Sequence, residues 1–394
     1  MTRIIHFYTF DFKGGNALSI HKKWFVGVFL LFIFGMGLFN VMASDRAFSE
    51  RENRPLDQMP EWSWANFISG KFTVRFEEYM SDQFVWKDDW VTLKAMSERV
   101  LLKQENNGVF FGKDGMLIEP FEKPSEQFDK NMAYVKKFAT YAESIQSYLL
   151  LAPTAIGLYE DRLPLFAQTA DERDAFETAK EELAPVIDVI DVYDTLESHK
   201  NEQIYFNTDH HWTMRGAYLA YREAAKVLGV QPYDEGDFRI ETVSDNFYGT
   251  LHAKVNAIGI KPDKIEVYVP TFETTQTVTY TDGQKSDSLF EWDYLEKNDQ
   301  YSLFLGGNHP LVTIKTGVGN GRKLAVVKDS YAHALIPFLA NHFEEIHVLD
   351  LRYYHSDILL YMNDQNISEV LFLYNVANFT KDTNVMWLSQ SIRE

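Results

Sequence analysis

The chain has 394 residues, no cysteine and a formal net charge of −19 at neutral pH. Its length and apolar content are typical of a folded protein with one large domain or two smaller ones. The missing cysteines exclude disulfides and thiolate metal sites. The acidic charge argues against general nucleic-acid binding, which needs a basic surface.

The residues from Trp24 to Ala43 form an apolar segment without a single charge. Such a segment is long enough to cross the hydrocarbon core of a membrane. Lys22 and Lys23 precede it, so the positive-inside rule predicts a cytoplasmic N-terminus and an extracytoplasmic remainder. A cleaved signal peptide is the alternative. We therefore expect a cytoplasmic tail (1–23), a transmembrane helix (24–43), a juxtamembrane linker (44–60) and an extracytoplasmic domain (61–394).

The rest of the chain alternates between helical and strand-like patterns. Helical spacing of apolar residues runs through 61–105, and a Gly-Lys-Asp-Gly turn predicts a hairpin within Val109–Ile118. We then expect helices over 127–147, Ala170–Leu183 and Met214–Leu228, and buried strands over Tyr148–Ala152 and Val186–Val192. Residues 231–320 are rich in Thr, Tyr, Val, Asp and Gly, which indicates a β-rich insertion.

The C-terminal part repeats a strand–helix pattern with apolar strands. Strands are expected over Lys323–Val327, Glu345–Leu351 and Glu369–Tyr374, with helices over Tyr331–Asn341 and Ser356–Asn363 between them. Apolar strands that alternate with helices imply a parallel sheet covered on both faces. The predicted fold class is therefore α/β.

Two short segments carry the groups of a Ser-His-Asp site. Asp209 and His211 are two positions apart, so in an extended stretch both point to the same side, while His210 points elsewhere. Ser330 follows a predicted buried strand and opens a helix, whose N-terminus offers N–H groups to a developing oxyanion. In this interpretation His211 is the base for the Ser330 hydroxyl, and Asp209 orients the imidazole. The alternative is that Ser330 and Asp209 only cap helices.

Two further residues stand at the ends of C-terminal strands. Asn375 could donate to an oxyanion, and Arg352 could do the same or bind an anionic group; a turn asparagine and a surface arginine are the plainer interpretations. A divalent metal held by Asp209, His210 and His211, with His333 or His252, is a further alternative. No Asp-x-Asp pair at a strand end supports it, and we expect neither a metal nor a cofactor.

The order of these motifs resembles the DHHW family, which is related to the extracytoplasmic alginate O-acetyltransferases of the SGNH hydrolase-like superfamily. The resemblance is carried by Asp209-His210-His211-Trp212, Asp329-Ser330, the N-terminal anchor, the linker Glu52-Asn53-Arg54-Pro55-Leu56, and the segment from Asn107 to Leu117. It implies a three-layer α/β/α fold and assigns nucleophile, base and acid to Ser330, His211 and Asp209. Asn375 falls where the superfamily's oxyanion asparagine is expected.

The resemblance also implies a reaction and partners. Ser330 would form an acyl-enzyme, and a hydroxyl of an extracellular polysaccharide or cell-wall glycan would then accept the acyl group. A multi-spanning membrane-bound O-acyltransferase is the expected donor partner. Two alternatives stay open: a carbohydrate esterase that uses the same residues, and a non-catalytic glycan-binding or scaffold subunit of a polysaccharide export complex.

Overall fold

The computed structural model describes residues 15–49 and 54–391. Most of the expected cytoplasmic tail, residues 50–53 of the expected linker and the last three residues lie outside the described residues. The chain divides into two compact units, with the boundary between Val91 and Thr92. The domain boundaries expected from the sequence remain predictions.

The first unit begins with helix α1 (Gly15–Met42), which contains an apolar stretch from Lys22 to Met42. Among the described residues it is the one helix long and apolar enough to cross a membrane, and it confirms the expected apolar helix near the N-terminus. The short strands β1 (Phe48–Ser49) and β2 (Arg54–Pro55) pair with each other. Helices α2 (Trp64–Ile68) and α3 (Lys71–Asp82) follow, and the unit boundary falls within α4 (Lys87–Val100).

The second unit is built on an eight-stranded sheet. Its strand order is β11-β10-β12-β14-β13-β15-β6-β7. The five strands from β14 to β7 are parallel, whereas β12, β10 and β11 pair antiparallel at the other edge. The strands are β6 (Gln146–Ala152), β7 (Asp188–Val189), β10 (Gln276–Tyr280), β11 (Lys285–Ser286), β12 (Leu311–Thr316), β13 (Lys323–Lys328), β14 (Glu345–Leu349) and β15 (Glu369–Asn375). The mixed α/β fold with a mainly parallel sheet is confirmed.

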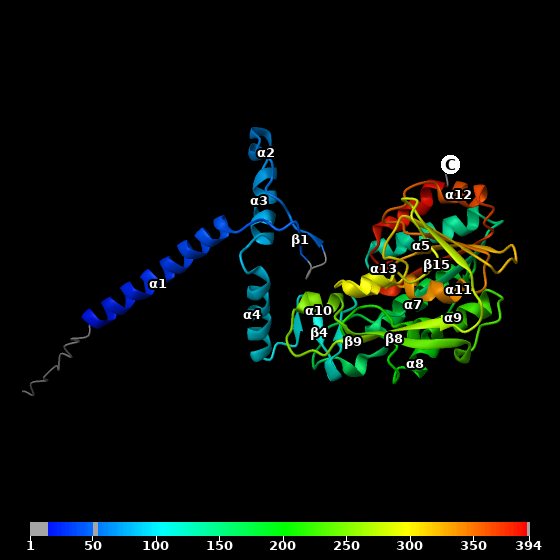
Figure 1. The fold of residues 1–394 in the computed structure, drawn as a ribbon, viewed down its shortest axis with the longest axis horizontal. Helices are drawn as coiled ribbons and strands as arrows, with labels where there is room; N and C mark the ends of the chain where they lie inside the picture. Colours follow the sequence, from blue (N-terminus) through cyan, green and yellow to red (C-terminus); the bar gives the residue numbers. More distant parts are fainter. Residues whose placement is uncertain (1–14, 50–53, 392–394) are drawn as a thin grey trace, which may run out of the picture. The chain divides into compact units, whose positions relative to one another are not determined.

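Helices cover this sheet, because the side chains of its central strands are mostly apolar and buried on both faces (Figure 1). Phe138 of α5 packs edge-on against Phe372 of β15, and Tyr221 of α9 stacks on Phe338 of α11. The helices of the unit are α5 (Glu126–Tyr141), α6 (Ala155–Leu158), α7 (Glu172–Leu183), α8 (Tyr193–Ser198), α9 (Met214–Val227), α10 (Thr250–Val255), α11 (Ala332–Leu339), α12 (Ile358–Asp364) and α13 (Val376–Phe379). The expected hairpin is present in β3 (Glu105–Asn106), β4 (Val109–Phe111) and β5 (Leu117–Ile118).

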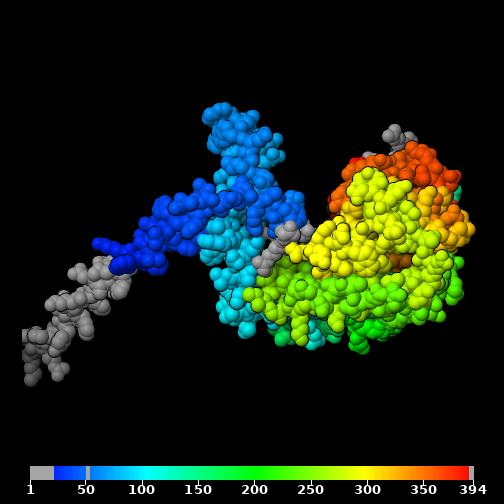
Figure 2. All heavy atoms as spheres, in the orientation of Figure 1, coloured from blue at the N-terminus to red at the C-terminus, as the bar shows by residue number. Residues whose placement is uncertain are grey.

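The segment 231–320 is β-rich, as expected, and its strands belong to two different sheets. Strands β8 (Phe238–Phe247) and β9 (Asp263–Pro270) pair in a separate two-stranded sheet, whereas β10, β11 and β12 extend the main sheet. On the face drawn in Figure 2, the yellow surface around residue 300 lies between the green surface of β8 and β9 and the orange C-terminal part. The insertion therefore reaches the same region as the C-terminal strands.

Candidate active site

Ser330 stands on a sharp turn between β13 and α11, at the carboxyl edge of the parallel strands. Asp329, immediately before it, is buried and ties this turn to the end of β15. Its carboxylate accepts hydrogen bonds from the Tyr331 amide (2.9 Å), from the Asn375 amide (2.9 Å) and side chain (2.8 Å), and from the Asn378 side chain (3.2 Å). Asp329 therefore fixes the turn that presents Ser330.

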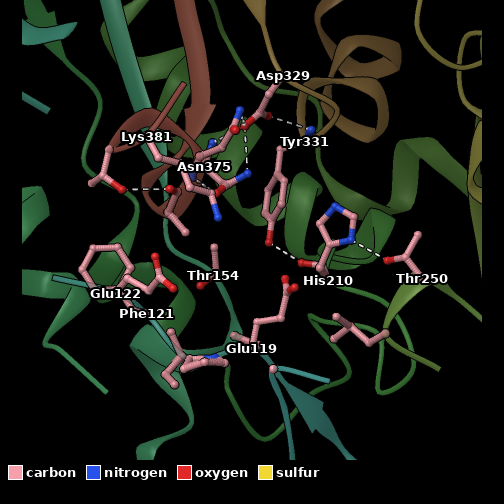
Figure 3. Close-up of a pocket in the computed structure, with 18 of the residues that line it drawn as sticks. Glu119, Phe121, Glu122, Thr154, His210, Thr250, Asp329, Tyr331, Asn375 and Lys381 are labelled. Atoms are coloured by element: carbon pink, nitrogen blue, oxygen red, sulfur yellow. Dashed lines mark hydrogen bonds between the residues drawn. The ribbon is translucent and has the colours of Figure 1, made fainter. Parts of the chain in front are cut away.

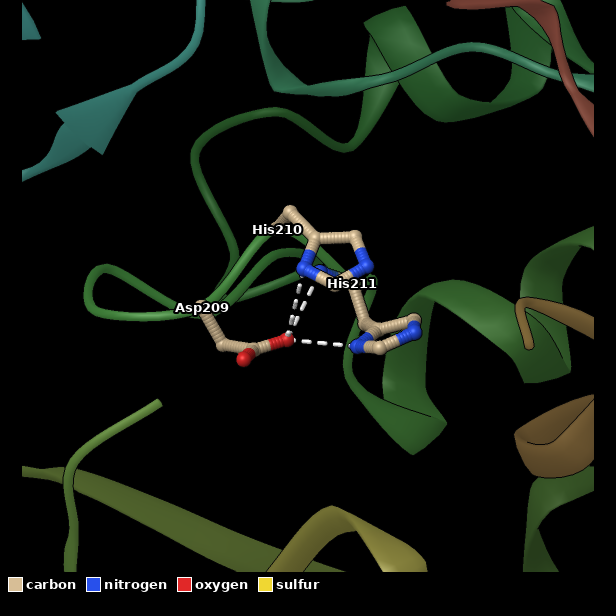
Figure 4. A group of neighbouring side chains, drawn as sticks. All are labelled: Asp209, His210 and His211. Atoms are coloured by element: carbon tan, nitrogen blue, oxygen red, sulfur yellow. Dashed lines mark hydrogen bonds and ion pairs between the residues drawn. The ribbon is translucent and has the colours of Figure 1, made fainter. Parts of the chain in front are cut away.

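The structure brings Ser330, His211 and Asp209 together. Nε2 of His211 lies 2.7 Å from Oγ of Ser330, and Nδ1 of His211 lies 2.5 Å from Oδ1 of Asp209. Asp209 also accepts from the backbone amide of His211 at 3.0 Å. Figure 4 shows the carboxylate of Asp209 directed at His211 and His210. This is the relative placement of acid, imidazole and hydroxyl that serine-dependent acyl transfer requires.

The Asp209 side chain is held from the other side by the start of α10. Thr250 donates to Oδ2 of Asp209 from its amide (2.7 Å) and its hydroxyl (3.0 Å). Gly249 precedes Thr250, and a Cβ added there would lie 2.2 Å from Cβ of Asp209. The close approach of the position 249 backbone to Asp209 therefore requires glycine, since any side chain there would displace the Asp209 carboxylate.

A second carboxylate holds the loop that carries Asp209. Asp263, at the start of β9, is buried and accepts from the amides of Asn207 (3.0 Å) and Thr208 (2.7 Å). It also accepts from the Thr208 hydroxyl (2.7 Å) and from the side chains of Asn207 (3.0 Å) and Gln203 (3.2 Å). A single buried carboxylate with five donors fixes the backbone just before Asp209.

Aromatic side chains join the histidine loop to the serine turn. The indole N–H of Trp212 donates to the carbonyl of Tyr331 at 2.9 Å, and the Tyr331 hydroxyl donates to the carbonyl of His210. Tyr301, from the insertion, stacks flat on His211 with ring centroids 3.7 Å apart and an interplanar angle of 7°. Its hydroxyl donates to the Ser330 carbonyl at 3.2 Å. These contacts fix the two loops relative to each other.

The surroundings set the protonation states of the acid and the imidazole. Burial and the neighbouring His210 lower the pKa of His211 to about 4, although Asp209 opposes this change. Burial alone would raise the pKa of Asp209, but the two histidines and the hydrogen bonds to it bring that pKa well below its usual range. At neutral pH the pair is therefore a carboxylate beside a neutral imidazole that is free to accept a proton.

A cavity of about 560 Å³ opens onto Ser330. His210 and Thr250 line it on one side, and Asn375 and Asp329 line it on another (Figure 3). The expectation that His210 points away from the site is wrong. Residues 207–211 form bends rather than a strand, so alternate side chains do not point to opposite sides, and the His210 and His211 rings lie 3.8 Å apart.

Asn375 and Arg352 both line this cavity, and each has partners in the protein. One side-chain N–H of Asn375 donates to Asp329, which leaves the second hydrogen of that amide. Arg352 donates from Nε and Nη2 to the two oxygens of Asp350, at 2.8 and 2.6 Å, and from Nη2 to Asn308 at 2.8 Å. Its side chain is 32% exposed.

A buried charged network lies under Arg352. Nζ of Lys328, which is almost fully buried, lies 2.8 Å from Asp350, 2.7 Å from Nε2 of His333 and 3.2 Å from Oδ1 of Asn308. Burial lowers the pKa of Lys328, and Asp350 opposes that change. Burial and Lys328 lower the pKa of His333 well below its usual range. Because Asp350 accepts hydrogen bonds from both Lys328 and Arg352, this network orients the Arg352 guanidinium at the cavity wall.

Asp209, His210 and His211 also form a group whose ligand atoms all lie within 4.8 Å of one another. These atoms are already engaged: Nδ1 of His211 pairs with Asp209, and Nδ1 of His210 lies 2.7 Å from the Thr250 hydroxyl. His333 pairs with Lys328, and Nε2 of His252 lies 3.2 Å from the Ala257 carbonyl. A cation at this group would therefore have to displace the contacts that align the imidazole.

Residues 121–349 match the family model described as DHHW protein. The chain belongs to the DHHW family. A DHHW family protein of known structure from Eubacterium siraeum is 28% identical, with a TM-score of 0.64 over 74% of this chain and 97% of that one. Bacillus cereus PatB1, solved with a sulfonyl adduct, shares the fold at 21% identity and a TM-score of 0.61, over 71% of this chain and 97% of that one.

A curated relative of this family member is the probable alginate O-acetylase AlgJ of Pseudomonas fluorescens. The two are 23% identical over 219 residues, which is 52% of this chain and 51% of AlgJ. The chain thus spans about half the length of that curated relative.

Sequence reasoning missed several residues that organise the site of this DHHW protein. Thr250 and Tyr301 come from the insertion, and Asp263 starts a strand of it. Gly249 and Thr250 are neighbours in the insertion, and nothing in the local sequence connects them to Asp209. Their contacts depend on how the insertion folds back over the sheet.

Proposed function

We propose that this protein is a membrane-anchored O-acetyltransferase that moves an acyl group through Ser330 onto hydroxyls of an extracellular polysaccharide or cell-wall glycan. The observation that carries the proposal is the chain of contacts from Ser330 Oγ to His211 (2.7 Å) and on to Asp209 (2.5 Å), at the wall of a cavity. Membership of the DHHW family and similarity to an alginate O-acetylase support the choice of reaction.

In the proposed mechanism His211 takes the proton from the Ser330 hydroxyl as Oγ attacks the acyl carbonyl of the donor. The C–O or C–S bond to the donor's leaving group breaks, and His211 returns the proton to that group. A sugar hydroxyl then gives its proton to His211 and attacks the acyl-enzyme. The Ser330 ester bond breaks, Ser330 regains a proton from His211, and the sugar carries the new ester.

We propose that Asn375 and Arg352 act on the negative charge that develops on the carbonyl oxygen. Asn375 has one amide hydrogen beyond the one given to Asp329, and Arg352 is held at the cavity wall by Asp350. Donors held in place before the reaction stabilise an oxyanion without having to reorient. Loss of one such donor is expected to slow acylation by about 10²- to 10³-fold.

The proposed location follows from the apolar helix and the charges around it. We propose that α1 crosses the membrane once, that its N-terminus is cytoplasmic, and that the Ser330 site is extracytoplasmic. A multi-spanning O-acyltransferase is the proposed donor partner, since the acyl group must be delivered on the side of the membrane where the site lies.

The full-length protein in detergent is the material for the test. It is incubated with p-nitrophenyl acetate and a bare oligosaccharide, and acetyl transfer to the sugar is measured by mass. Asp209→Asn is expected to lower the rate by about 10⁴-fold, because the imidazole loses its orienting carboxylate. Acetyl release to water alone, with none on the sugar, would refute the transferase and favour the esterase.

The pH dependence gives a second check. Because the pKa of His211 is lowered to about 4, the acylation rate should stay constant from pH 8 down to about 5. It should fall below that range as the imidazole becomes protonated and can no longer accept the serine proton. A rate that instead halves near pH 6.5 would contradict a buried, neutral His211.

A further inference from the structure

The unit Met1–Val91 carries an apolar surface that the candidate acyl-transfer site does not explain. We define the aromatic patch as Trp62, Trp64, Phe67, Ile68, Phe72 and Phe76. Helix α2 has no buried residue, and the only buried residue of α3 is Asp82. Trp64 is 71% exposed and Ile68 is 81% exposed. An exposed apolar surface of this kind marks an interaction site.

A continuous row of rings connects the aromatic patch to the end of the apolar helix. Trp62 lies 4.9 Å from Phe72, Phe72 lies 5.8 Å from Phe76, and Phe76 lies 6.0 Å from Tyr79, as measured between ring centroids. The Tyr79 hydroxyl then donates to Asp45, three residues after α1 ends. The aromatic patch is therefore continuous with the point where α1 would leave the membrane.

Hydrogen bonds hold α3 beside the same end of α1. The Val85 amide donates to Oδ1 of Asn40 at 2.9 Å, and the Arg46 amide donates to the Gln83 side chain at 2.9 Å. The buried Asp82 carboxylate accepts two hydrogen bonds from Arg54, at 2.7 and 2.6 Å. These contacts join the end of α1 and the residues that follow it to α3 and the residues just after α3. They therefore fix the position of α3 relative to the end of α1.

The charge of the segment also differs from that of the whole chain. Between Trp62 and Phe76 the only charged residues are Lys71 and Arg75, although the chain carries a net charge of −19. Four of the eight tryptophans (Trp62, Trp64, Trp86 and Trp90) lie between the end of α1 and residue 91. Tryptophan is enriched at membrane–water interfaces, and cations beside an apolar face suit anionic lipid headgroups.

We propose that the aromatic patch lies in the interfacial layer of the membrane leaflet at which α1 ends, with Lys71 and Arg75 among the headgroups. The patch is then a second membrane contact, and α3 lies along the membrane surface rather than standing away from it. This arrangement does not depend on acyl transfer. It restricts the motion of the segment that follows α1.

The test uses the absence of cysteine, because a single introduced cysteine is labelled uniquely. The full-length Ile68→Cys and Ser69→Cys proteins are spin-labelled and inserted into nanodiscs that contain phosphatidylglycerol. Leu31→Cys, within α1, is the hydrocarbon reference. Phe166→Cys is the aqueous reference, since Phe166 is an apolar side chain with 96% exposure outside this unit. Power saturation with oxygen and with a nickel chelate reports the depth of each label.

We expect the labels at residues 68 and 69 to be more accessible to oxygen than to the nickel chelate, as at residue 31 and opposite to residue 166. Labels at 68 and 69 as accessible to the nickel chelate as the label at 166 would overturn the proposal. Protection from both reagents would also overturn it, because it would place a protein surface over the patch. Replacement of Lys71 and Arg75 by Gln should move the spin labels at residues 68 and 69 closer to the water phase. An unchanged label depth would overturn the proposal that the two cations bind the headgroups.

Discussion

Glu172 offers a sharp test of how the cavity wall is built. Glu172 is 2% exposed, and its carboxyl holds the loop after β6. It accepts a hydrogen bond from the Thr154 amide at 2.7 Å and is hydrogen-bonded to the Thr154 hydroxyl at 2.5 Å and to the Tyr193 hydroxyl at 3.2 Å. Thr154 lines the cavity that holds Ser330. Burial raises the pKa of Glu172 to about 7, although the hydrogen bonds oppose this. The folded state therefore holds this proton more tightly than the unfolded chain, whose pKa is 4.5.

The sign and size of the effect on stability follow from that difference. The contribution of the protonated carboxyl is fully present below pH 4.5 and is lost as the pH rises through about 7. At about 1.4 kcal/mol for each pKa unit, the free energy of unfolding should fall by about 3 kcal/mol across this window because of Glu172 alone. Glu172→Gln keeps the shape and the hydrogen bonds of the protonated form, and it removes the titration.

The assay is urea unfolding of the full-length wild type and of Glu172→Gln in detergent, at pH 5 and pH 8. Tryptophan fluorescence, to which the buried Trp212 contributes, follows the unfolding. Other titrating groups contribute equally to both proteins and cancel in the difference. We expect Glu172→Gln to gain about 2 to 3 kcal/mol relative to the wild type between pH 5 and pH 8. A difference that stays the same at the two pH values would refute the buried, protonated Glu172.

Two substitutions test the close approach of Gly249 to Asp209 and the hydrogen bond between Trp212 and Tyr331. In Gly249→Ala the new Cβ would lie 2.4 Å from Oδ2 of Asp209, so acylation should slow by about 10²-fold, whereas Gly236→Ala meets nothing within 4 Å and should keep the wild-type rate. Equal rates for the two variants would contradict the close approach. Trp212→Phe leaves the Tyr331 carbonyl without its indole donor and should lower the free energy of unfolding by about 1 to 3 kcal/mol. Unchanged urea stability would show that this hydrogen bond contributes nothing.

Much of the fold could be predicted because its signals are local. The strand before Ser330 has an apolar centre, Leu324–Val327, as a buried parallel strand must have, and the helix over Met214–Leu228 begins one residue after its N-cap, Thr213. The Asp209–His211 spacing also suggested a shared direction, although the segment bends instead of extending. The residue types of a Ser-His-Asp site suggested that the Asp209–His211 segment meets Ser330, and the family resemblance, which contains both motifs in this order, supported the same pairing.

The parts that escaped prediction depend on pairing between distant residues. Strand β12 is antiparallel to β14, with Val312 opposite Val348, and no property of either segment alone specifies that partner. Tyr301 is one of many aromatic residues of the insertion, and only the folded insertion places it flat against His211. The burial of Lys328 against Asp350 is similar, since the sequence shows only a lysine at the end of an apolar strand.

The central claim is that Ser330 becomes acylated, and intact mass tests it most directly. The full-length protein is treated with p-nitrophenyl acetate beside two variants, Ser330→Ala and Ser198→Ala. Ser198 is the matched control, because its hydroxyl lies 3.0 Å from Nδ1 of His199 on the exposed surface. We expect one acetyl adduct in the wild type and in Ser198→Ala, and none in Ser330→Ala. An adduct that persists in Ser330→Ala, or that never forms in the wild type, would contradict it.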